Sequence, residues 1–308
     1  MPVAVVDIGT NSTRLLIAEV DSSTGAVEEL VRHSQVTRLG DGVDARGSLS
    51  EEAMERVFQT LVGYRTEIDA HACTANLAVL TSAVRDARNG AAFAARVRNE
   101  FGLDARVLTG DEEARLTFRG AMSGRPAPTE PTVVIDIGGG STEFVIGVRS
   151  EVRFHTSLHA GVVRMSERHI HSDPPEAQEL QELALDARAT YLDGLPPDVR
   201  EPVRRGIAVA GTATSAASID QELDPYDPAK VHGYPLLLAT VEMLLARLAD
   251  LDEEERQKVT GLDPRRAPTI VAGMILLEEA IGAFALDEVE VSEHDILHGG
   301  VLLLSEGG

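Results

Sequence analysis

The N-terminal part of the chain alternates between apolar runs and turn-forming segments. Residues 3–7 and 13–19 are rich in apolar and β-branched side chains, and the string Gly9-Thr10-Asn11-Ser12 between them consists of residues that favour turns. Two such runs around a short turn predict a β-hairpin. A further run at 27–36 predicts a third strand, so the chain is expected to open with three consecutive strands.

A helical period follows this strand-rich segment. A capping-box pattern begins at Ser48, and apolar side chains then recur at helical spacing as far as Ile68, which predicts one amphipathic helix. Short apolar runs predict strands at 77–80 and 103–108, with a helical stretch at 91–101 between them. Because strands and helices alternate in this way, the expected fold class is α/β.

The clearest break in the chain lies between Ser123 and Pro131, a segment that contains three prolines and a glycine. Such residues interrupt regular structure, so we expect one domain at 1–126 and a second at 127–308. The second part begins again with strand, turn and strand over 132–148, and its later apolar patterns predict mainly helices. These helices are expected after Pro175, at 236–248, at 269–284 and after Ser292.

Both parts contain a similar short string. Asp7-Ile8-Gly9-Thr10-Asn11-Ser12-Thr13 and Asp136-Ile137-Gly138-Gly139-Gly140-Ser141-Thr142 are offset by 129 residues and agree at five of seven positions. Each copy ends an apolar strand on an aspartate and continues into a turn of small residues, whose N–H groups can approach an anion. Two such hairpins facing one cleft are suited to hold adjacent phosphates, with the aspartates binding a divalent cation. The alternative is two ordinary hairpins with glycine-rich turns.

Charge and composition exclude several classes of protein. The 308 residues include 28 basic and 50 acidic side chains, a formal net charge of −22, which argues against nonspecific binding of nucleic acid because such binding needs a basic face. Neither Lys230 nor Lys258, the two lysines, lies in a Walker-type phosphate loop, and the glycine string of dinucleotide-binding proteins is missing.

Cysteine usage and hydropathy indicate the compartment. Cys73 is the single cysteine, which excludes an internal disulfide framework or a four-cysteine zinc site, and a cytoplasmic location is expected. The longest apolar stretch, 270–277, is too short to cross a bilayer. The N-terminus also lacks the pattern of a signal peptide. We therefore expect no membrane role.

The two repeated strings resemble the first and second phosphate motifs of the sugar kinase, heat-shock protein and actin superfamily. Within that superfamily, further strings resemble the exopolyphosphatase and guanosine pentaphosphate phosphohydrolase (Ppx/GppA) family. These strings are Thr37–Gly42, Thr81–Asn89, Gly110–Leu116, Gly161–Arg164 and Ala210–Thr214. The resemblance extends along essentially the whole chain and implies two actin-like (ribonuclease H-like) domains with an interdomain cleft.

The resemblance also implies catalytic residues. Hydrolysis of a phosphoanhydride needs a carboxylate that takes a proton from the attacking water, and the family places it at the second glutamate of Glu-Glu-Ala-Arg-Leu, which is Glu113. The alternative is that residues 111–113 only begin a helix, where acidic side chains interact favourably with the helix dipole. Arg85 matches a family arginine suited to bind the polyanion. Weaker candidates are Arg14, Arg38, Arg88, Arg115 and Arg164.

A metal and a set of phosphate contacts follow from the same motifs. Mg²⁺ (or Mn²⁺) usually takes one or two carboxylates, and the family assigns the aspartate and glutamate of the second motif, Asp136 and Glu143, to the metal; Asp7 is expected to join them. The alternative is that Glu143 is a solvent-facing strand residue. Phosphate contacts are predicted for Gly9, Thr10, Asn11, Ser12, Gly138, Gly139, Gly140, Ser141, Thr142, Gly211 and Thr212.

A pair of histidines near the C-terminus forms a separate pattern. His294 and His298 are four residues apart and could share a helix face that holds zinc, but Asp295 stands where the H-E-x-x-H motif needs glutamate. Because this spacing is common, zinc is not the expected occupant. The family usually has a Gly-Leu-Arg-Glu-Gly-like string near this end, and this chain departs from it over residues 295–300.

The function that these features favour is Mg²⁺-dependent removal of terminal phosphate from inorganic polyphosphate. Guanosine pentaphosphate is the alternative substrate within the family. A small-molecule kinase is another alternative, although kinases of the superfamily usually have a glycine pair where Ala210-Gly211-Thr212 has one glycine; an actin-like assembly protein is a third. The acidic charge and the end of the chain at Gly308, where larger members carry additional helical domains, predict a preference for short polyphosphates. A homodimer is also expected from the family.

Overall fold

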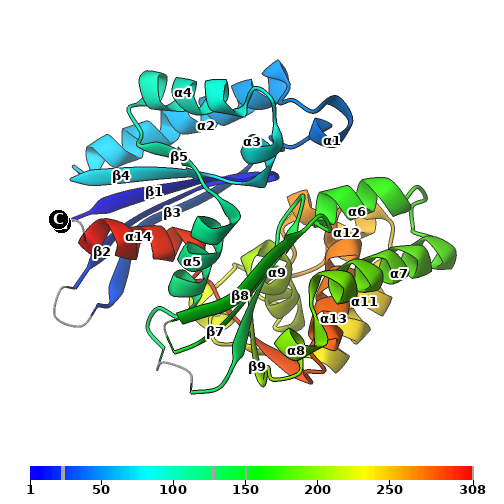
Figure 1. The fold of residues 1–308 in the computed structure, drawn as a ribbon. Helices are drawn as coiled ribbons and strands as arrows, with labels where there is room; N and C mark the ends of the chain where they lie inside the picture. Colours follow the sequence, from blue (N-terminus) through cyan, green and yellow to red (C-terminus); the bar gives the residue numbers. More distant parts are fainter. Residues whose placement is uncertain (22–24, 126–128, 150, 307–308) are drawn as a thin grey trace. The chain divides into compact units, whose positions relative to one another are not determined.

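The computed structural model describes residues 1–21, 25–125, 129–149 and 151–306. The chain forms two compact units, one of Met1–Pro126 with His294–Gly308 and the other of Ala127–Glu293. Each unit is built on one mixed sheet with helices packed on it (Figure 1). The predicted boundary between 126 and 127 lies outside the described residues.

The sheet of the first unit has the strand order β3-β2-β1-β4-β5. The first three strands are antiparallel neighbours, and β4 and β5 continue the sheet in parallel with β1. This confirms the predicted hairpin and third strand. The strands are β1 (Val3–Ile8), β2 (Ser12–Val20), β3 (Val27–Val36), β4 (Ala75–Leu80) and β5 (Ala105–Val107). The helices are α1 (Val43–Arg46), α2 (Glu51–Ala70), α3 (Ser82–Asp86), α4 (Gly90–Phe101), α5 (Gly110–Ala121) and α14 (Ile296–Glu306).

Both faces of β1 are covered, which explains why all of its residues are buried. Because successive side chains of a strand point to opposite faces, Val6 and its alternating neighbours join the core beneath α2 and α4. Val5 lies on the other face and packs in one cluster with Leu297 and Val301 of α14. A strand buried on two sides loses the polar alternation of a half-exposed strand.

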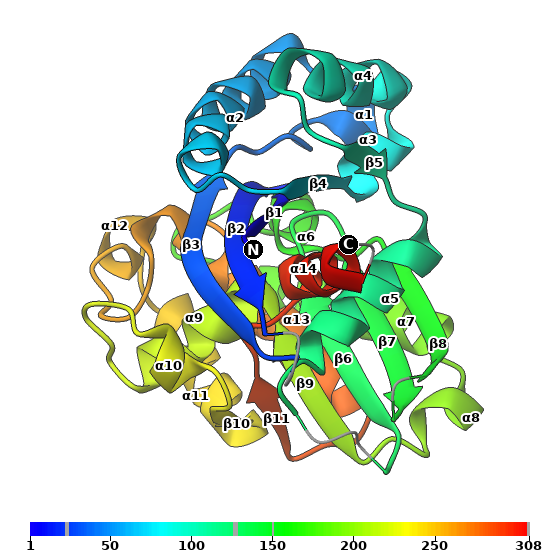
Figure 2. The same cartoon turned by 90° about the vertical axis from the view of Figure 1, so that its left-hand side faces the viewer.

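The position of α14 corrects the predicted domain division. The sequence assigned the terminal helix to the second domain, at 127–308, but this helix packs against β1 and against α5 of the first unit (Figure 2). The contact with α5 is close: an added Cβ at Gly120 would collide with the backbone of Asp295, and one at Gly299 with the backbone of Leu116. Apolar burial and the fit of these glycines, rather than chain order, decide where the helix lies.

The second unit repeats this architecture with an added edge strand. Its sheet order is β8-β7-β6-β9-β11-β10. The strands are β6 (Thr132–Ile137), β7 (Thr142–Val148), β8 (Glu151–Leu158), β9 (Arg205–Val209), β10 (Pro235–Leu237) and β11 (Glu288–Val291). The helical segments are α6 (Val162–His169), α7 (Ala177–Gly194), α8 (Pro197–Arg200), α9 (Ala210–Asp220), α10 (Pro228–Val231), α11 (Leu238–Ala249), α12 (Glu253–Arg256), the 3₁₀ turn η1 (Pro264–Arg266) and α13 (Ile270–Ala283).

The duplication suggested by the short repeat extends to the sheets. The order β3-β2-β1-β4-β5 corresponds to β8-β7-β6-β9-β11, with the same parallel and antiparallel pairs. Even the irregularity in the second strand recurs, between Ile17 and Ala18 in the first unit and between Ile146 and Gly147 in the second. These positions keep the offset of the repeated strings, so the likeness covers whole hairpins and not only their turns.

The apolar helices of the described residues belong to the cores of the two units. Among them is α13, which is apolar but has only 14 residues, and no described helix is both long enough and apolar enough to cross a membrane.

Candidate functional site

The first phosphate-motif turn is held on two sides by other predicted motifs. The amide of Gly9 donates to the carbonyl of Ser12 at 3.0 Å, which closes the turn. The carbonyl of Asn11 accepts hydrogen bonds from the amides of Thr37 and Arg38 at 3.0 and 2.8 Å. Arg38 has a left-handed backbone, with φ 47°, and this kink brings both amides onto one acceptor.

The same turn touches the start of α3. The hydroxyl of Thr10 lies 3.0 Å from that of Ser82, and the amide of Gly40 donates to the carbonyl of Thr10 at 2.8 Å. A Cβ at Gly40 would collide with the Thr10 side chain, so glycine is needed for this close approach. The strings around Thr37 and Thr81, far apart in the sequence, therefore meet at one turn.

Three charged residues, Asp7, Arg14 and Asp295, form a chain of ion pairs at the strands that flank this turn. Arg14 of β2 stands opposite Asp7 in the sheet register and donates to its Oδ2 from Nε and Nη2, at 2.9 and 2.7 Å. The Nη1 group of Arg14 pairs with Asp295, which caps the start of α14 by accepting from the amide of Leu297. One arginine thus joins the first phosphate motif to the C-terminal helix.

The pKa values of the two buried aspartates, Asp7 and Asp295, are shifted in opposite directions. Burial raises the pKa of Asp7, and the Arg14 guanidinium offsets only part of that rise. Burial also opposes ionisation of Asp295, but the positive charges of Arg14, Arg32 and His298 outweigh it and hold the pKa of Asp295 below its ordinary value. Arg14, a weak candidate in the sequence, is therefore a structural partner of Asp7.

Glu113 is buried although it lies in an acidic helix start. Thr109 and Glu112 form the capping box of α5, so the role of Glu112 is to stabilise the start of the helix. Glu113, one residue on, is 8% exposed and turns into the unit. Its Oε2 accepts a hydrogen bond from Nη1 of Arg85 at 2.7 Å, and the same nitrogen lies 3.2 Å from the carbonyl oxygen of Leu108.

The electrostatics of Glu113 suit a proton acceptor. Burial raises the pKa of Glu113 above its ordinary value, Arg85 opposes the rise, and the negative charge of Asp7 adds to it. A buried carboxylate with a raised pKa accepts a proton more readily than an exposed one. Arg85 orients the carboxylate from α3, which begins at the end of β4.

The second phosphate-motif turn repeats the closing hydrogen bond. The amide of Gly138 donates to the carbonyl of Ser141 at 2.9 Å. The carbonyls of Gly138 and Gly139 accept from the amides of Val162 and Val163, and Nε of Arg164 donates to the carbonyl of Gly140. Within the described part of the chain, no hydrogen-bond acceptor lies at the amides of Gly139 and Gly140, so these N–H groups have the form of an anion-binding turn.

Glu143 is not a solvent-facing strand residue. It is 9% exposed, and its Oε1 accepts from the hydroxyls of Ser141 and Ser157 at 2.5 and 2.7 Å. Asp136 and Glu143 are direct partners in the register of β6 and β7, so their side chains share one face of the sheet. Two carboxylates on one face of the sheet could hold a divalent cation.

The predicted phosphate contacts Gly211 and Thr212 lie in the first turn of α9. Ala210, the first residue of this helix, has a left-handed backbone with φ 63°, and Val209 before it supplies no side-chain cap. A side chain at Gly211 would collide with the guanidinium of Arg266. The helix start therefore lies beside a positive charge, an arrangement that favours an anion.

The structure brings the candidates together in two groups. The first unit gathers Asp7, the turn after it, Arg85 and Glu113; the second gathers Asp136, the glycine turn and Glu143. The expectation that both groups serve one cleft stays a prediction, as do the catalytic and metal-binding roles. Sequence reasoning missed Asp295, and no local signal could identify it because its partner is near the other end of the chain.

Two sheets of one strand order with equivalent hairpins define an internally duplicated α/β protein, and the predicted actin-like fold class is confirmed by solved structures of this architecture. The model of the Ppx/GppA phosphatase family matches residues 16–306. The chain belongs to this family.

Relatives resemble the chain over nearly its full length. Exopolyphosphatase 2 of Mycobacterium tuberculosis is 37% identical over 318 residues, which cover 98% of each chain. A crystal structure of the Ppx/GppA family member of Aquifex aeolicus is 32% identical, covers 100% of this chain and 99% of its own, and has a TM-score of 0.84. An exopolyphosphatase from Cytophaga hutchinsonii is 28% identical, with coverage of 100% and 98% and a TM-score of 0.89.

Proposed function

We propose that this protein is an exopolyphosphatase that hydrolyses the terminal phosphoanhydride bond of inorganic polyphosphate and releases orthophosphate. The observation that carries the proposal is the buried Glu113 carboxylate, held by Arg85 of α3, the helix whose Ser82 contacts the first phosphate-motif turn. A relative named an exopolyphosphatase is 37% identical over nearly the whole chain, which supports the choice of substrate.

In the proposed reaction Glu113 is the general base. Arg85 engages Oε2, so Oε1 is the atom that accepts a proton from the attacking water. The water oxygen forms a bond to the terminal phosphorus while the bond to the bridging oxygen breaks, and the shortened chain leaves with that oxygen. The amides of the glycine turns and the guanidinium of Arg85 offset the negative charge of the phosphates.

The donor set of the second unit fits Mg²⁺ or Mn²⁺. Asp136 and Glu143 place two hard carboxylate groups on one face of the sheet, and Mg²⁺ is usually held by one or two carboxylates together with substrate phosphates and water. The hydroxyls of Ser141 and Ser157 orient the Glu143 carboxylate. A bound divalent cation would neutralise phosphate charge in the transition state.

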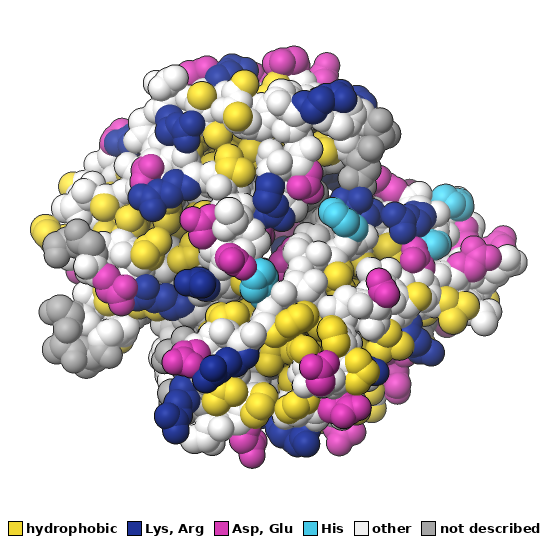
Figure 3. All heavy atoms as spheres, in the orientation of Figure 1, with side chains coloured by type: hydrophobic (Ala, Val, Ile, Leu, Met, Phe, Trp, Pro, Cys, Tyr) yellow, Lys and Arg dark blue, Asp and Glu magenta, His cyan; other side chains and the backbone are white. Residues whose placement is uncertain are grey.

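The surface charge supports short polyphosphates as substrates. The net charge is −22, and on the face drawn in Figure 3 the basic side chains are interspersed with acidic ones instead of forming a continuous basic tract. Beyond a Debye length of about 8 Å, only local arginines can attract a polyanion. We therefore propose that chains of a few phosphates react with higher kcat/KM than chains of several hundred.

A substrate panel tests this function. Purified protein is assayed for released orthophosphate with short and long polyphosphate, guanosine pentaphosphate and ATP, each with Mg²⁺ or with EDTA. The proposal expects Mg²⁺-dependent release from polyphosphate without a nucleotide, with the short chains preferred. Release only from guanosine pentaphosphate would replace the proposal by the other activity of the family, and an advantage for long chains would contradict the length preference.

A pair of adjacent variants tests the general base. Glu113→Gln is expected to lower kcat about 10³-fold, with an unchanged far-UV circular dichroism spectrum, because the amide cannot take the proton. The matched control is Glu112→Gln, which removes a carboxylate from the capping box of the same helix and leaves Glu113 in place. A near-wild-type rate for Glu113→Gln would exclude it as the base.

A further inference from the structure

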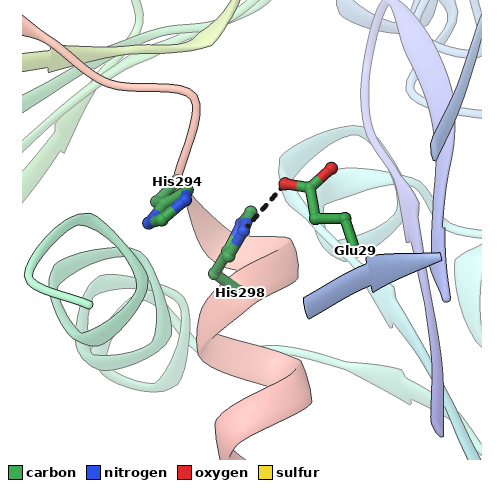
Figure 4. A group of neighbouring side chains, drawn as sticks. All are labelled: Glu29, His294 and His298. Atoms are coloured by element: carbon green, nitrogen blue, oxygen red, sulfur yellow. Dashed lines mark ion pairs between the residues drawn. The ribbon is translucent and has the colours of Figure 1, made fainter. Parts of the chain in front are cut away.

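A second group of metal-binding side chains lies in the first unit, apart from the residues assigned above to phosphate and Mg²⁺. Glu29 of β3 meets His294 and His298 at the start of α14 (Figure 4). One ligand atom from each of the three lies within 4.8 Å of the others. The histidine pair was visible in the sequence, but the carboxylate that completes the set comes from the opposite end of the chain.

His298 is the least explained side chain of this group. Its exposure is 0%, and its Nδ1 has no hydrogen-bond partner among the residues that the structure describes. Its Nε2 lies 3.0 Å from Oε1 of Glu29, in an ion pair. A buried polar atom without a hydrogen bond is costly, whereas a nitrogen that binds a metal ion needs no such partner.

The two imidazoles are arranged as neighbouring ligands. Their ring centroids are 3.9 Å apart with 23° between the planes. Metal ions bind the neutral form of imidazole, and two neutral rings can stack at this separation without charge repulsion. Nδ1 of His294 lies 3.3 Å from the carbonyl oxygen of Ser123. A ligating histidine commonly donates its second N–H to such a carbonyl, which directs the lone pair to the other nitrogen.

Charge and access both favour a cation. Glu29 supplies a carboxylate oxygen 3.0 Å from Nε2 of His298, and a carboxylate is a ligand that suits a cation. Arg32 competes, because its Nη1 lies 3.0 Å from the same Oε1, and a metal ion must displace it or use Oε2. The Glu29 side chain is 32% exposed, which gives an ion a route to the buried ring.

We propose that Glu29, His294 and His298 bind a divalent transition-metal ion, with Zn²⁺ as the representative of the class. Two imidazoles and one carboxylate are a ligand set that suits zinc, which takes nitrogen at about 2.0–2.1 Å and oxygen at about 2.0–2.2 Å. Ligand atoms around such an ion are about 3.3 Å apart, so the side chains need only small rotations. A bound ion would fasten α14 to β3 within the first unit, one residue from the Asp295 that holds Arg14.

Direct metal titration tests the site. Full-length protein freed of metal with EDTA is titrated with Zn²⁺ by calorimetry and against a chromophoric chelator. We expect one ion per chain in this site, with affinity reduced about tenfold or more in Glu29→Gln and in His294→Ala. The controls are Glu28→Gln, an exposed glutamate of the same strand, and His169→Ala, whose imidazole pairs with the carboxylate of Asp186 in the second unit; both should bind like the wild type.

Thermal unfolding gives a second readout. Zn²⁺ should raise the unfolding temperature of the wild type and of the two controls but not that of Glu29→Gln, because an ion that binds the folded state stabilises it. Mg²⁺ at equal concentration should have no such effect through imidazole ligands. The proposal is overturned if the wild type binds no Zn²⁺, or if Glu29→Gln and His294→Ala both bind and are stabilised like the wild type. Activity is not needed for either readout.

Discussion

The two phosphate-motif hairpins share a backbone but differ in charge at one equivalent position. In β1 and β2, Asp7 stands opposite Arg14; in β6 and β7, Asp136 stands opposite Glu143. The first aspartate is paired with a cation of the protein itself, and the second faces another carboxylate. A duplicated hairpin can therefore keep its turn geometry while a change at one residue alters what each copy can bind.

The difference bears on the predicted metal ligands. Asp7, Asp136 and Glu143 were expected to act together, and this remains a prediction. The geometry favours the second hairpin as the main donor, because Arg14 already binds the Asp7 carboxylate with two nitrogens. In the first hairpin the aspartate instead contributes its charge to the environment of Glu113. Substitutions in the first hairpin are thus expected to lower stability, and substitutions in the second to weaken metal binding.

The largest effect on stability is expected at the first hairpin. Arg14→Met leaves Asp7 and Asp295 buried without their shared cation, so the free energy of unfolding should fall by about 3 kcal/mol, measured by urea denaturation. Arg115→Met, at an exposed position of α5, is the control and should stay within about 0.5 kcal/mol of the wild type. Adding Asp295→Asn to Arg14→Met should restore part of the loss. An unaltered stability of Arg14→Met would show that the chain of ion pairs is not structural.

The second hairpin should respond through its metal dependence. Glu143→Gln removes one hard anionic ligand, so the Mg²⁺ concentration for half-maximal activity should rise about tenfold or more, measured by phosphate release across a Mg²⁺ series. Glu151→Gln, an exposed carboxylate on neighbouring β8, should leave the series unchanged. If Glu143→Gln needs no more Mg²⁺ than the wild type, the proposed division between the hairpins is wrong.

The smallest effect is a displacement of the pH profile. A general base must be deprotonated, so kcat/KM should fall about tenfold per pH unit below the pKa of Glu113 and level off above it. Burial raises that pKa above the ordinary value of 4.5, and Arg85 opposes the rise. Arg85→Met should therefore move the acid limb to higher pH, whereas Glu112→Gln should not move it. A shift to lower pH in Arg85→Met would contradict the assigned electrostatics.

Much of the fold was predictable because its signals are local. The hairpin of residues 3–19 and the long helix that ends near Ile68 have strong periodicity, and the structure places them within a few residues of the prediction. The strands β8, β9, β10 and β11 were not predicted. Their apolar runs are brief, and β8 is half exposed, so periodicity alone could not separate them from loops.

The candidate site was predictable where a motif includes the functional residue. Glu113 and Glu143 were selected from their strings, and both are buried, which local composition alone did not indicate because each has a polar or acidic neighbour. Asp295 and Glu29 were not selected. Their importance lies in partners near the opposite end of the chain, and no spacing rule relates such positions.

The sequence by itself determined the family, the α/β class and the two phosphate-motif turns, because each depends on residues that are neighbours in the chain. Only the tertiary structure decided that the C-terminal helix belongs to the first unit, that Arg14 binds both Asp7 and Asp295, and that Glu29 meets the two histidines. The physical reason is that local structure follows from periodicity and turn chemistry, whereas pairing between distant segments follows from which apolar faces bury each other.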